Sequence, residues 1–308
     1  MNLHTKALSV ACLVALGSLL AVSTSAQKFQ LPTQAHQPKA VVGDATDGSR
    51  SQGKPKSDGV NPNATQTCTY KFTSGSGATY LQFCVTVNGN IVEFNSPQGI
   101  EQLSQGGALE GYGICDGSTS IGYYDYAYAD SGNWGAPTTV SHTSTEVKIE
   151  RTTSDGAWTL TQTISPVAGT NPYAKIAMEL KNNSAATKLA FLLRYGNANP
   201  EAAGSTGNYY ENYDGSIDSA WGNTDYNSTN GSTAYGLMLQ NVGNPAPTSV
   251  PYGRQGFAIT GVDGPAPCNS TANIASPITE AEGSIVYFYQ VQLNKDQTVT
   301  VTDRYQSF

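Results

Sequence analysis

The segment 197–233 combines carboxylates with aromatic rings, two groups that together suit a sugar site. Carboxylate oxygens accept hydrogen bonds from sugar hydroxyls, and flat rings cover the apolar faces of pyranoses. A similar mixture occurs in the segment 111–137. The predicted ligand-binding residues are Tyr209, Tyr210, Tyr213, Trp221, Tyr226, Tyr124, Tyr126, Trp134 and Arg194. The alternative is that these residues cover the core and anchor irregular loops.

The acids of the same segment could hydrolyse a glycoside, which requires two facing carboxyl groups about 5 to 9 Å apart. The sequence does not select a pair. Asp214 and Asp218 are the first catalytic candidates, with Asp225 and Glu211 behind them. The alternative is that acids in Gly/Asn-rich loops cap turns.

A lyase would need a cation and a group that exchanges a proton. Arg194 could neutralise a substrate carboxylate while Tyr195 or His142 transfers the proton. The alternative is that Arg194 pairs with a nearby acid of the protein itself.

Calcium takes oxygen ligands from Asp, Asn and backbone carbonyls. The candidate ligands are Asn212, Asp214, Asp218 and Asp225, whose spacing does not match an EF-hand loop. We expect no cofactor, with calcium as the ion that this segment could hold.

Several other chemistries are disfavoured. Apart from His4, the chain contains only His36 and His142, too few for a histidine-based catalytic zinc site. No Gly-x-Ser-x-Gly motif and no phosphate-binding glycine loop are present. The net charge of -7 and the isoelectric point near 4.9 disfavour a nucleic-acid partner.

Residues 1–26 have the pattern of an export signal. Lys6 lies in a short basic region, 7–22 is apolar, and Ser23 to Ala26 are small residues suited to cleavage, so the mature chain should begin near Gln27. An uncleaved anchor would need about 20 strongly apolar residues. A lipoprotein signal ending at Cys12 would have too short an apolar stretch. We predict an exported protein, secreted, periplasmic or at the cell surface, with no membrane span in the mature form.

The cysteines indicate two disulfides. Loss of Cys12 with the signal leaves Cys68, Cys84, Cys115 and Cys268, an even number in an oxidising compartment. Three pairings are possible. We favour Cys68 with Cys84, because the apolar runs around them resemble neighbouring strands, and this choice leaves Cys115 with Cys268.

The chain divides into three parts: the signal at 1–26, a flexible Pro/Gly/Gln/Lys-rich leader at 27–66, and one domain at 67–308. Within the domain, apolar and polar residues alternate over short runs, which predicts strands. The expected antiparallel pairs are 81–87 with 91–94, 147–150 with 158–164, 174–180 with 189–195, and 285–293 with 299–301. Their turns are Asn88-Gly89, Asp155-Gly156, Asn182-Asn183-Ser184 and Asn294-Lys295-Asp296.

Strands linked by hairpins without helices predict an all-β antiparallel sandwich, of a large double-sheet or supersandwich type, with long Gly/Asn/Tyr-rich loops. Our first hypothesis is an exported binding or surface-interaction module whose ligand is a neutral glycan, as a polysaccharide or on a cell surface. A carbohydrate-active enzyme is the alternative. A structural envelope or matrix protein that self-associates through sheet edges is the third hypothesis.

Overall fold

The computed structural model describes residues 66–103, 109–127, 129–200, 209–214, 219–224, 235–243, 253–260, 266–268, 274–275, 278–279 and 283–308. The expected signal and leader lie outside the described residues. Within these ranges, no helix is long and apolar enough to cross a membrane.

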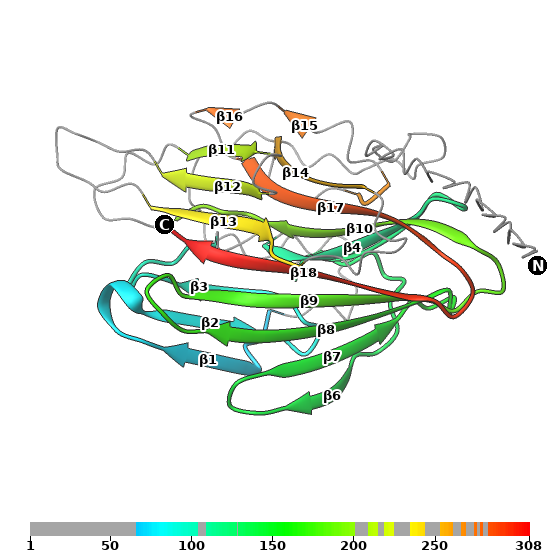
Figure 1. The fold of residues 1–308 in the computed structure, drawn as a ribbon, viewed down its shortest axis with the longest axis horizontal. Coiled ribbons are helices and arrows are strands. Elements are labelled where there is room, and N and C mark those ends of the chain that lie inside the picture. The colour runs from blue at the N-terminus through cyan, green and yellow to red at the C-terminus, as the bar shows by residue number, and fades with distance from the viewer. Residues whose placement is uncertain are drawn as a thin grey trace, which may run out of the picture.

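The described chain folds almost entirely into antiparallel strands arranged in three sheets (Figure 1). In spatial order, the nine-stranded sheet contains β16 (Ile278–Thr279), β11 (Tyr209–Asp214), β12 (Ser219–Thr224), β13 (Gly236–Asn241), β18 (Thr298–Ser307), β9 (Tyr173–Asn182), β8 (Trp158–Val167), β7 (Val147–Thr152) and β6 (Thr138–His142). The six-stranded sheet contains β15 (Ile274–Ala275), β14 (Gly253–Thr260), β17 (Gly283–Leu293), β10 (Lys188–Gly196), β4 (Glu110–Asp116) and β5 (Ile121–Asp125). The three-stranded sheet contains β1 (Tyr70–Ser74), β2 (Leu81–Val85) and β3 (Ile91–Asn95), with the short 3-10 helix η1 (Gly77–Thr79) between β1 and β2.

The core lies between the nine-stranded sheet and the two smaller sheets. One continuous apolar cluster takes residues from all three, including Phe94 of β3, Leu192 of β10 and Tyr305 of β18. The rings of Phe94 and Tyr305 meet edge to face at 6.2 Å between centroids. The antiparallel sandwich predicted from the alternating pattern is therefore confirmed.

Strand β18 shows how the sequence assigns the two faces of the nine-stranded sheet. Val299 and Val301 are buried, whereas Thr298, Thr300 and Thr302 are exposed or partly exposed between them. Because successive side chains of a strand point to opposite faces, this alternation turns an apolar row inward and a hydroxyl row outward. Threonine suits the outer row because it is β-branched yet polar.

Two of the predicted hairpins are confirmed. β7 pairs with β8 around Gly156, which adopts a φ of 72°, and β2 pairs with β3. The second turn is longer than the two residues expected. Thr86 N donates to Asn90 O at 2.9 Å, which leaves three residues in the loop and places Gly89 at a φ of 91°.

The other two predicted hairpins are wrong, because each turn carries the chain from one sheet to the other. β9 belongs to the nine-stranded sheet and β10 to the six-stranded sheet, and β17 and β18 are divided in the same way. The two crossovers are joined by hydrogen bonds. Asp296 N donates to Asn182 O at 2.8 Å, and Asn182 Nδ2 donates to Leu293 O at 2.9 Å. Alternation identified these strands but not their partners.

The segments expected as long loops also contain strands. β11 and β12 form an antiparallel pair inside 197–233, and β5 lies inside 111–137. Consequently, Trp221 sits on a strand of the large sheet and not in an irregular loop.

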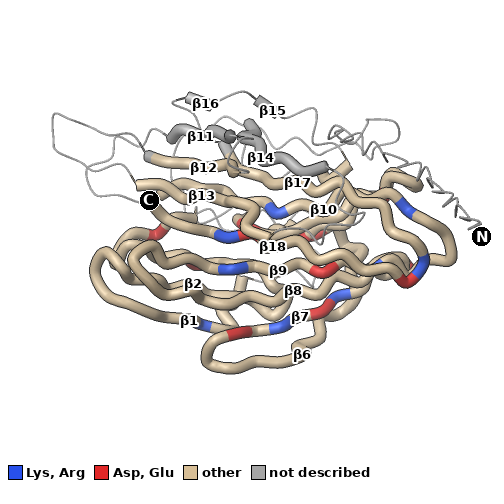
Figure 2. Tube along the Cα trace, in the orientation of Figure 1, with Lys and Arg blue, Asp and Glu red and all other residues tan. Residues whose placement is uncertain are grey.

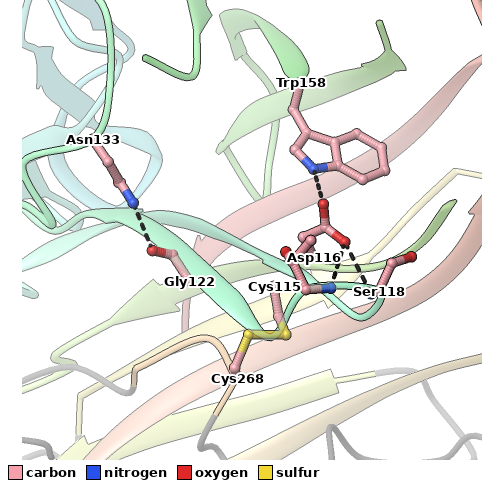
Figure 3. Close-up of a disulfide and its surroundings, with 8 residues drawn as sticks. Cys115, Asp116, Ser118, Gly122, Asn133, Trp158 and Cys268 are labelled. Atoms are coloured by element: carbon pink, nitrogen blue, oxygen red, sulfur yellow. Dashed lines mark hydrogen bonds between the residues drawn. A yellow bond between two sulfur atoms is a disulfide. The ribbon is translucent and has the colours of Figure 1, made fainter. Parts of the chain in front are cut away.

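Both predicted disulfides are present. Cys68 bonds to Cys84, and Cys115 of β4 bonds to Cys268 (Figure 3). Beside the second disulfide, Pro267 lies so close to the backbone of β4 that a Cβ on Gly113 would come within 2.7 Å of its ring. The long-range disulfide thus holds the segment 266–268 against the outer face of the six-stranded sheet.

Candidate functional site

The turn between β2 and β3 is buried between the sheets. Asn88 and Asn90, the polar residues of this turn, are 1% and 0% exposed. Turns normally lie at the surface, where water satisfies their backbone groups. A buried turn needs protein partners for the same groups.

An aspartate and an arginine hold one side of this turn. Asp125 Oδ2 accepts from Asn88 Nδ2 at 2.8 Å and from Arg151 Nη1 at 2.6 Å. Tyr112 donates its hydroxyl to Asn88 O at 2.7 Å, and Arg151 donates to that hydroxyl at 3.0 Å. Asn90 Nδ2 donates to the backbone oxygen of Asp125 at 3.0 Å.

A second ion pair holds the other side. Arg194 Nε pairs with Glu110, whose second oxygen accepts from Ile91 N at 2.6 Å. Arg194 also donates to Gln162 Oε1 at 2.6 Å and to Gly89 O at 3.4 Å. The two ion pairs therefore fix the turn from the six-stranded and the nine-stranded sheets together.

Burial dominates the electrostatics of these clusters. Desolvation raises the pKa of Glu110 to about 7, against the opposing effect of Arg194. Desolvation likewise raises the pKa of Asp125 to about 6, although Arg151 lowers it. Asp303 is buried beside Tyr289, whose hydroxyl donates to it, and desolvation raises its pKa to about 7.

Raised carboxyl pKa values are common at catalytic sites, but burial in a structural cluster raises them in the same way. Glu110, Asp125, Arg151 and Arg194 are all at most 2% exposed. A sugar could reach them only if the sandwich opened. We therefore assign both clusters to holding the buried turn.

This burial removes three residues from the candidate ligand contacts. Arg194 is 0% exposed and paired with an acid, which matches the alternative weighed for it in the sequence. Tyr126 is 0% exposed and stacks on Tyr124 at 5.0 Å between ring centroids. Trp134 is 3% exposed and lies under the guanidinium of Arg151 at 5.3 Å. Tyr124, the fourth predicted contact in this region, is partly exposed.

The residues proposed for a lyase lie on different sheets. Arg194 and the fully buried Tyr195 belong to β10, whereas His142 lies on the edge strand β6 of the nine-stranded sheet. Every residue of β6 is exposed, and the His142 ring lies 4.7 Å from the ring of Tyr70.

The outer face of the nine-stranded sheet carries the predicted residue that best suits a ligand contact, Trp221 on β12. The register pairs Trp221 with Met238 of β13, Met238 with Gln306 of β18, and Gln306 with Tyr173 of β9. All four side chains are partly exposed. Cross-strand partners share one face of a sheet, so these residues form a row across four neighbouring strands.

Polar groups line one side of this row. Arg304 Nε and Nη2 donate to Gln240 Oε1 at 3.0 and 2.6 Å. The same guanidinium lies 5.3 Å from the centre of the Tyr173 ring, which is a cation–π contact. These contacts fix the amide and the guanidinium beside the aromatic row.

A further ring borders the row on the other side. Phe308 is 56% exposed, and its ring lies over Gly236, where an added Cβ would come within 2.2 Å of Cζ. Gly236 pairs with Asn223, two residues from Trp221 on the same face. We call Trp221, Met238, Phe308, Tyr173, Gln306, Gln240 and Arg304 the outer platform. Charged residues occur on β18 and β9, whereas β12 and β13 contain none (Figure 2).

All six residues of β11, including the catalytic candidate Glu211, are predicted site residues and register partners of β12. Tyr210, Asn212 and Asp214 pair with Asn223, Trp221 and Ser219, respectively. Tyr209 and Tyr213 lie on β11 at the alternate register positions. Asp218, Asp225 and Tyr226 lie outside the described residues.

Among the residues whose side chains are described, no group of three or more metal-ligating side chains occurs. Of the expected calcium ligands, only the backbone of Asn212 and Asp214 is described. The calcium prediction therefore stays a prediction.

Sequence reasoning missed most of the outer platform. The missed residues lie on β9, β13 and β18 and just after β18, and they are distant in sequence: Tyr173, Met238, Gln240, Arg304, Gln306 and Phe308. Alternation could have placed Tyr173 opposite the core-facing Ala174 of β9. It could not have shown that β9, β18, β13 and β12 are neighbours.

Comparisons with known proteins give no family. No protein-family model matches the chain, and no curated protein matches it. Among solved structures, a bacterial glucoamylase in complex with acarbose matches at 11% identity and a TM-score of 0.48, covering 79% of this chain and 32% of that one. A putative aldose 1-epimerase from Escherichia coli K12 matches at 10% identity and a TM-score of 0.37, covering 77% and 98%. A heparan sulfate lyase mutant from Pedobacter heparinus matches at 8% identity and a TM-score of 0.42, covering 80% and 36%.

The chain therefore spans about a third of the length of the glucoamylase and of the lyase that it overlaps. Overlaps of this extent carry no argument about the activity or the ligand of this chain.

Proposed function

We propose that the protein is an exported binding module whose outer platform holds a neutral glycan. The observation that carries the proposal is the row of Trp221, Met238, Gln306 and Tyr173, with the exposed Phe308 beside it. Exposed rings supply flat apolar faces, and the neighbouring amides and guanidinium supply hydrogen bonds with fixed directions.

The arrangement of the platform supports binding of sugars in particular. Pyranose rings present an apolar face and an equatorial belt of hydroxyls, so they need a flat ring and polar groups at its edge. Arg304 and Gln240 are held in place by their mutual hydrogen bonds before any ligand arrives. Preorganised groups lose little conformational entropy on binding.

Two further observations support export. Disulfides persist in oxidising compartments, and the structure contains two. Residues 1–26 have the export pattern described above. The proposal therefore places the platform outside the cytoplasm, where polysaccharides and cell-surface glycans occur.

Affinity electrophoresis of the exported protein tests the proposal. The panel contains a β-1,4-glucan, a mannan, a xylan, starch and a uronic-acid polymer, each with calcium and with a chelator. We expect retardation by at least one neutral polymer and loss of that retardation in Trp221→Ala. Tyr80→Ala is the control, because Tyr80 is a partly exposed tyrosine that precedes β2 in the three-stranded sheet.

The outcomes separate the hypotheses. Retardation that is unchanged in both Trp221→Ala and Phe308→Ala would overturn the platform as the site. Release of soluble sugar from a retarding polymer would favour the enzyme alternative, and Asp214→Asn and Asp218→Asn would then be assayed for loss of product. A mobility unaffected by every polymer would overturn the glycan proposal and favour a structural or protein-binding role.

A further inference from the structure

The dimensions of the outer platform define the shape of its ligand. Trp221 lies on β12 and Tyr173 on β9, and the order β12-β13-β18-β9 separates them by three inter-strand steps. At about 4.8 Å for each step, the two residues stand about 14 Å apart across the sheet. This separation exceeds the width of a single pyranose ring.

The groups between the two ends form a continuous surface. Met238 and Gln306 occupy the two intervening strands in the same row. Gln306 Oε1 is enclosed and makes no hydrogen bond within the described part of the chain. The rest of the Gln306 side chain is partly exposed on this face.

The row runs across the strands and is bordered on both sides. Gln240 and Arg304 follow one side, and Phe308 over Gly236 marks the other. A ligand that contacts both Trp221 and Tyr173 must therefore be long and narrow, and it must lie perpendicular to the strands.

We propose that the ligand is an extended, linear polysaccharide that spans the outer platform from Trp221 to Tyr173, with consecutive sugar units over β12, β13, β18 and β9. This inference rests on the proposed glycan function and specifies its ligand class. The module binds along a linear chain and does not require a chain end, because the platform consists of one open sheet face.

A length series provides the test. The probes are monosaccharide, disaccharide and longer oligosaccharides, up to the hexamer, of the polymer that retards the protein, and the readout is the dissociation constant from calorimetry. We expect affinity to rise steeply with length until both ends of the platform are filled, and then to level off. Tyr173→Ala should weaken binding of the hexamer by about 2- to 12-fold, the range for one aromatic contact. The same variant should leave binding of the disaccharide at the Trp221 end unchanged.

Trp221→Ala should weaken binding of both the hexamer and the disaccharide, because the disaccharide binds at the Trp221 end. Tyr80→Ala again controls for an unrelated aromatic substitution. Circular dichroism and thermal melting of each variant check that the fold is intact. If the polymer binds but monosaccharide and hexamer have the same affinity per molecule, the extended-ligand inference is overturned and the glycan function stands. If no polymer or oligosaccharide binds, both proposals fail.

Discussion

Replacing Arg194 with Met tests whether the buried ion pairs hold the two layers together. The substitution keeps an unbranched side chain of similar reach and removes the guanidinium. It leaves Glu110, which is 0% exposed, without its cation. It also removes the donors to Gln162 Oε1 at 2.6 Å and to Gly89 O at 3.4 Å.

The expected loss follows from these contacts. Breaking one partner of a buried ion pair lowers the free energy of unfolding by about 3–5 kcal/mol, because Glu110 must then either stay charged without a cation or take up a proton and lose its ionic partner. In a domain of this size the loss corresponds to a fall in Tm of roughly 6–20 °C. The double variant Arg194→Met with Glu110→Gln should recover part of the loss, because no buried charge is then left unpaired.

Unfolding in guanidinium chloride, followed by tryptophan fluorescence, measures the effect. A surface ion pair supplies the control. Lys71 lies 3.4 Å from Glu93, with the two side chains 50% and 38% exposed. Such a pair contributes about 0–1 kcal/mol, so Lys71→Met should change the unfolding midpoint little. A midpoint in Arg194→Met that matches the one in Lys71→Met would refute the argument that this ion pair anchors the buried turn.

Three further predictions concern the stability of the sandwich. Burial raises the pKa of Glu110 from 4.5 to about 7. Because the folded state binds this proton more tightly than the unfolded state, the stabilisation is fully present below pH 4.5 and is lost as the pH rises through about 7. The urea midpoint of unfolding should therefore be higher at about pH 5 than at about pH 8. Cys115→Ser removes a disulfide that joins residues 153 apart and should lower the free energy of unfolding by about 5 kcal/mol. Cys68→Ser removes one that joins residues 16 apart and should lower it by about 3 kcal/mol. Differential scanning calorimetry measures both losses. Asn182→Ala should cost about 1–3 kcal/mol in the same assay, and Asn183→Ala less, because only Asn182 is fully buried.

The sequence predicted the strands well because alternation is a local signal. β8 and β9 each carry a strict inward row, such as Leu160 and Ile164 in β8, and both segments were identified. The pairing of strands depends instead on contacts between residues far apart in the chain. The turn at Asn182 has the composition of a hairpin and yet crosses between sheets. Nothing in its local sequence distinguishes the two outcomes.

The burial of the β2–β3 turn is a second feature that local sequence conceals. Asn88-Gly89 is a turn signal, and turns are normally exposed to solvent. Its burial depends on Arg151 and Arg194, which lie 60 or more residues away in the chain and meet it only in the folded sandwich. The same long-range origin explains why the sequence suggested a ligand contact for Arg194. The local sequence around an arginine at a strand end is the same whether the side chain faces a substrate or an internal carboxylate.

The placement of charges and rings bears on how the outer platform works. The carboxylates Glu110 and Asp125 are enclosed with their arginines, whereas Trp221 and Phe308 remain at least partly exposed on the outer face. An interior tied by two ion-pair clusters fixes the layers that carry β12, β13, β18 and β9, and side chains on such strands keep their positions better than side chains on loops. Under the proposed function, a flat and rigid face would lose little conformational entropy when a polysaccharide lies across it, so modest contacts at each sugar unit would add up. The buried turn would then contribute to binding indirectly, by fixing the sheets that carry the outer platform.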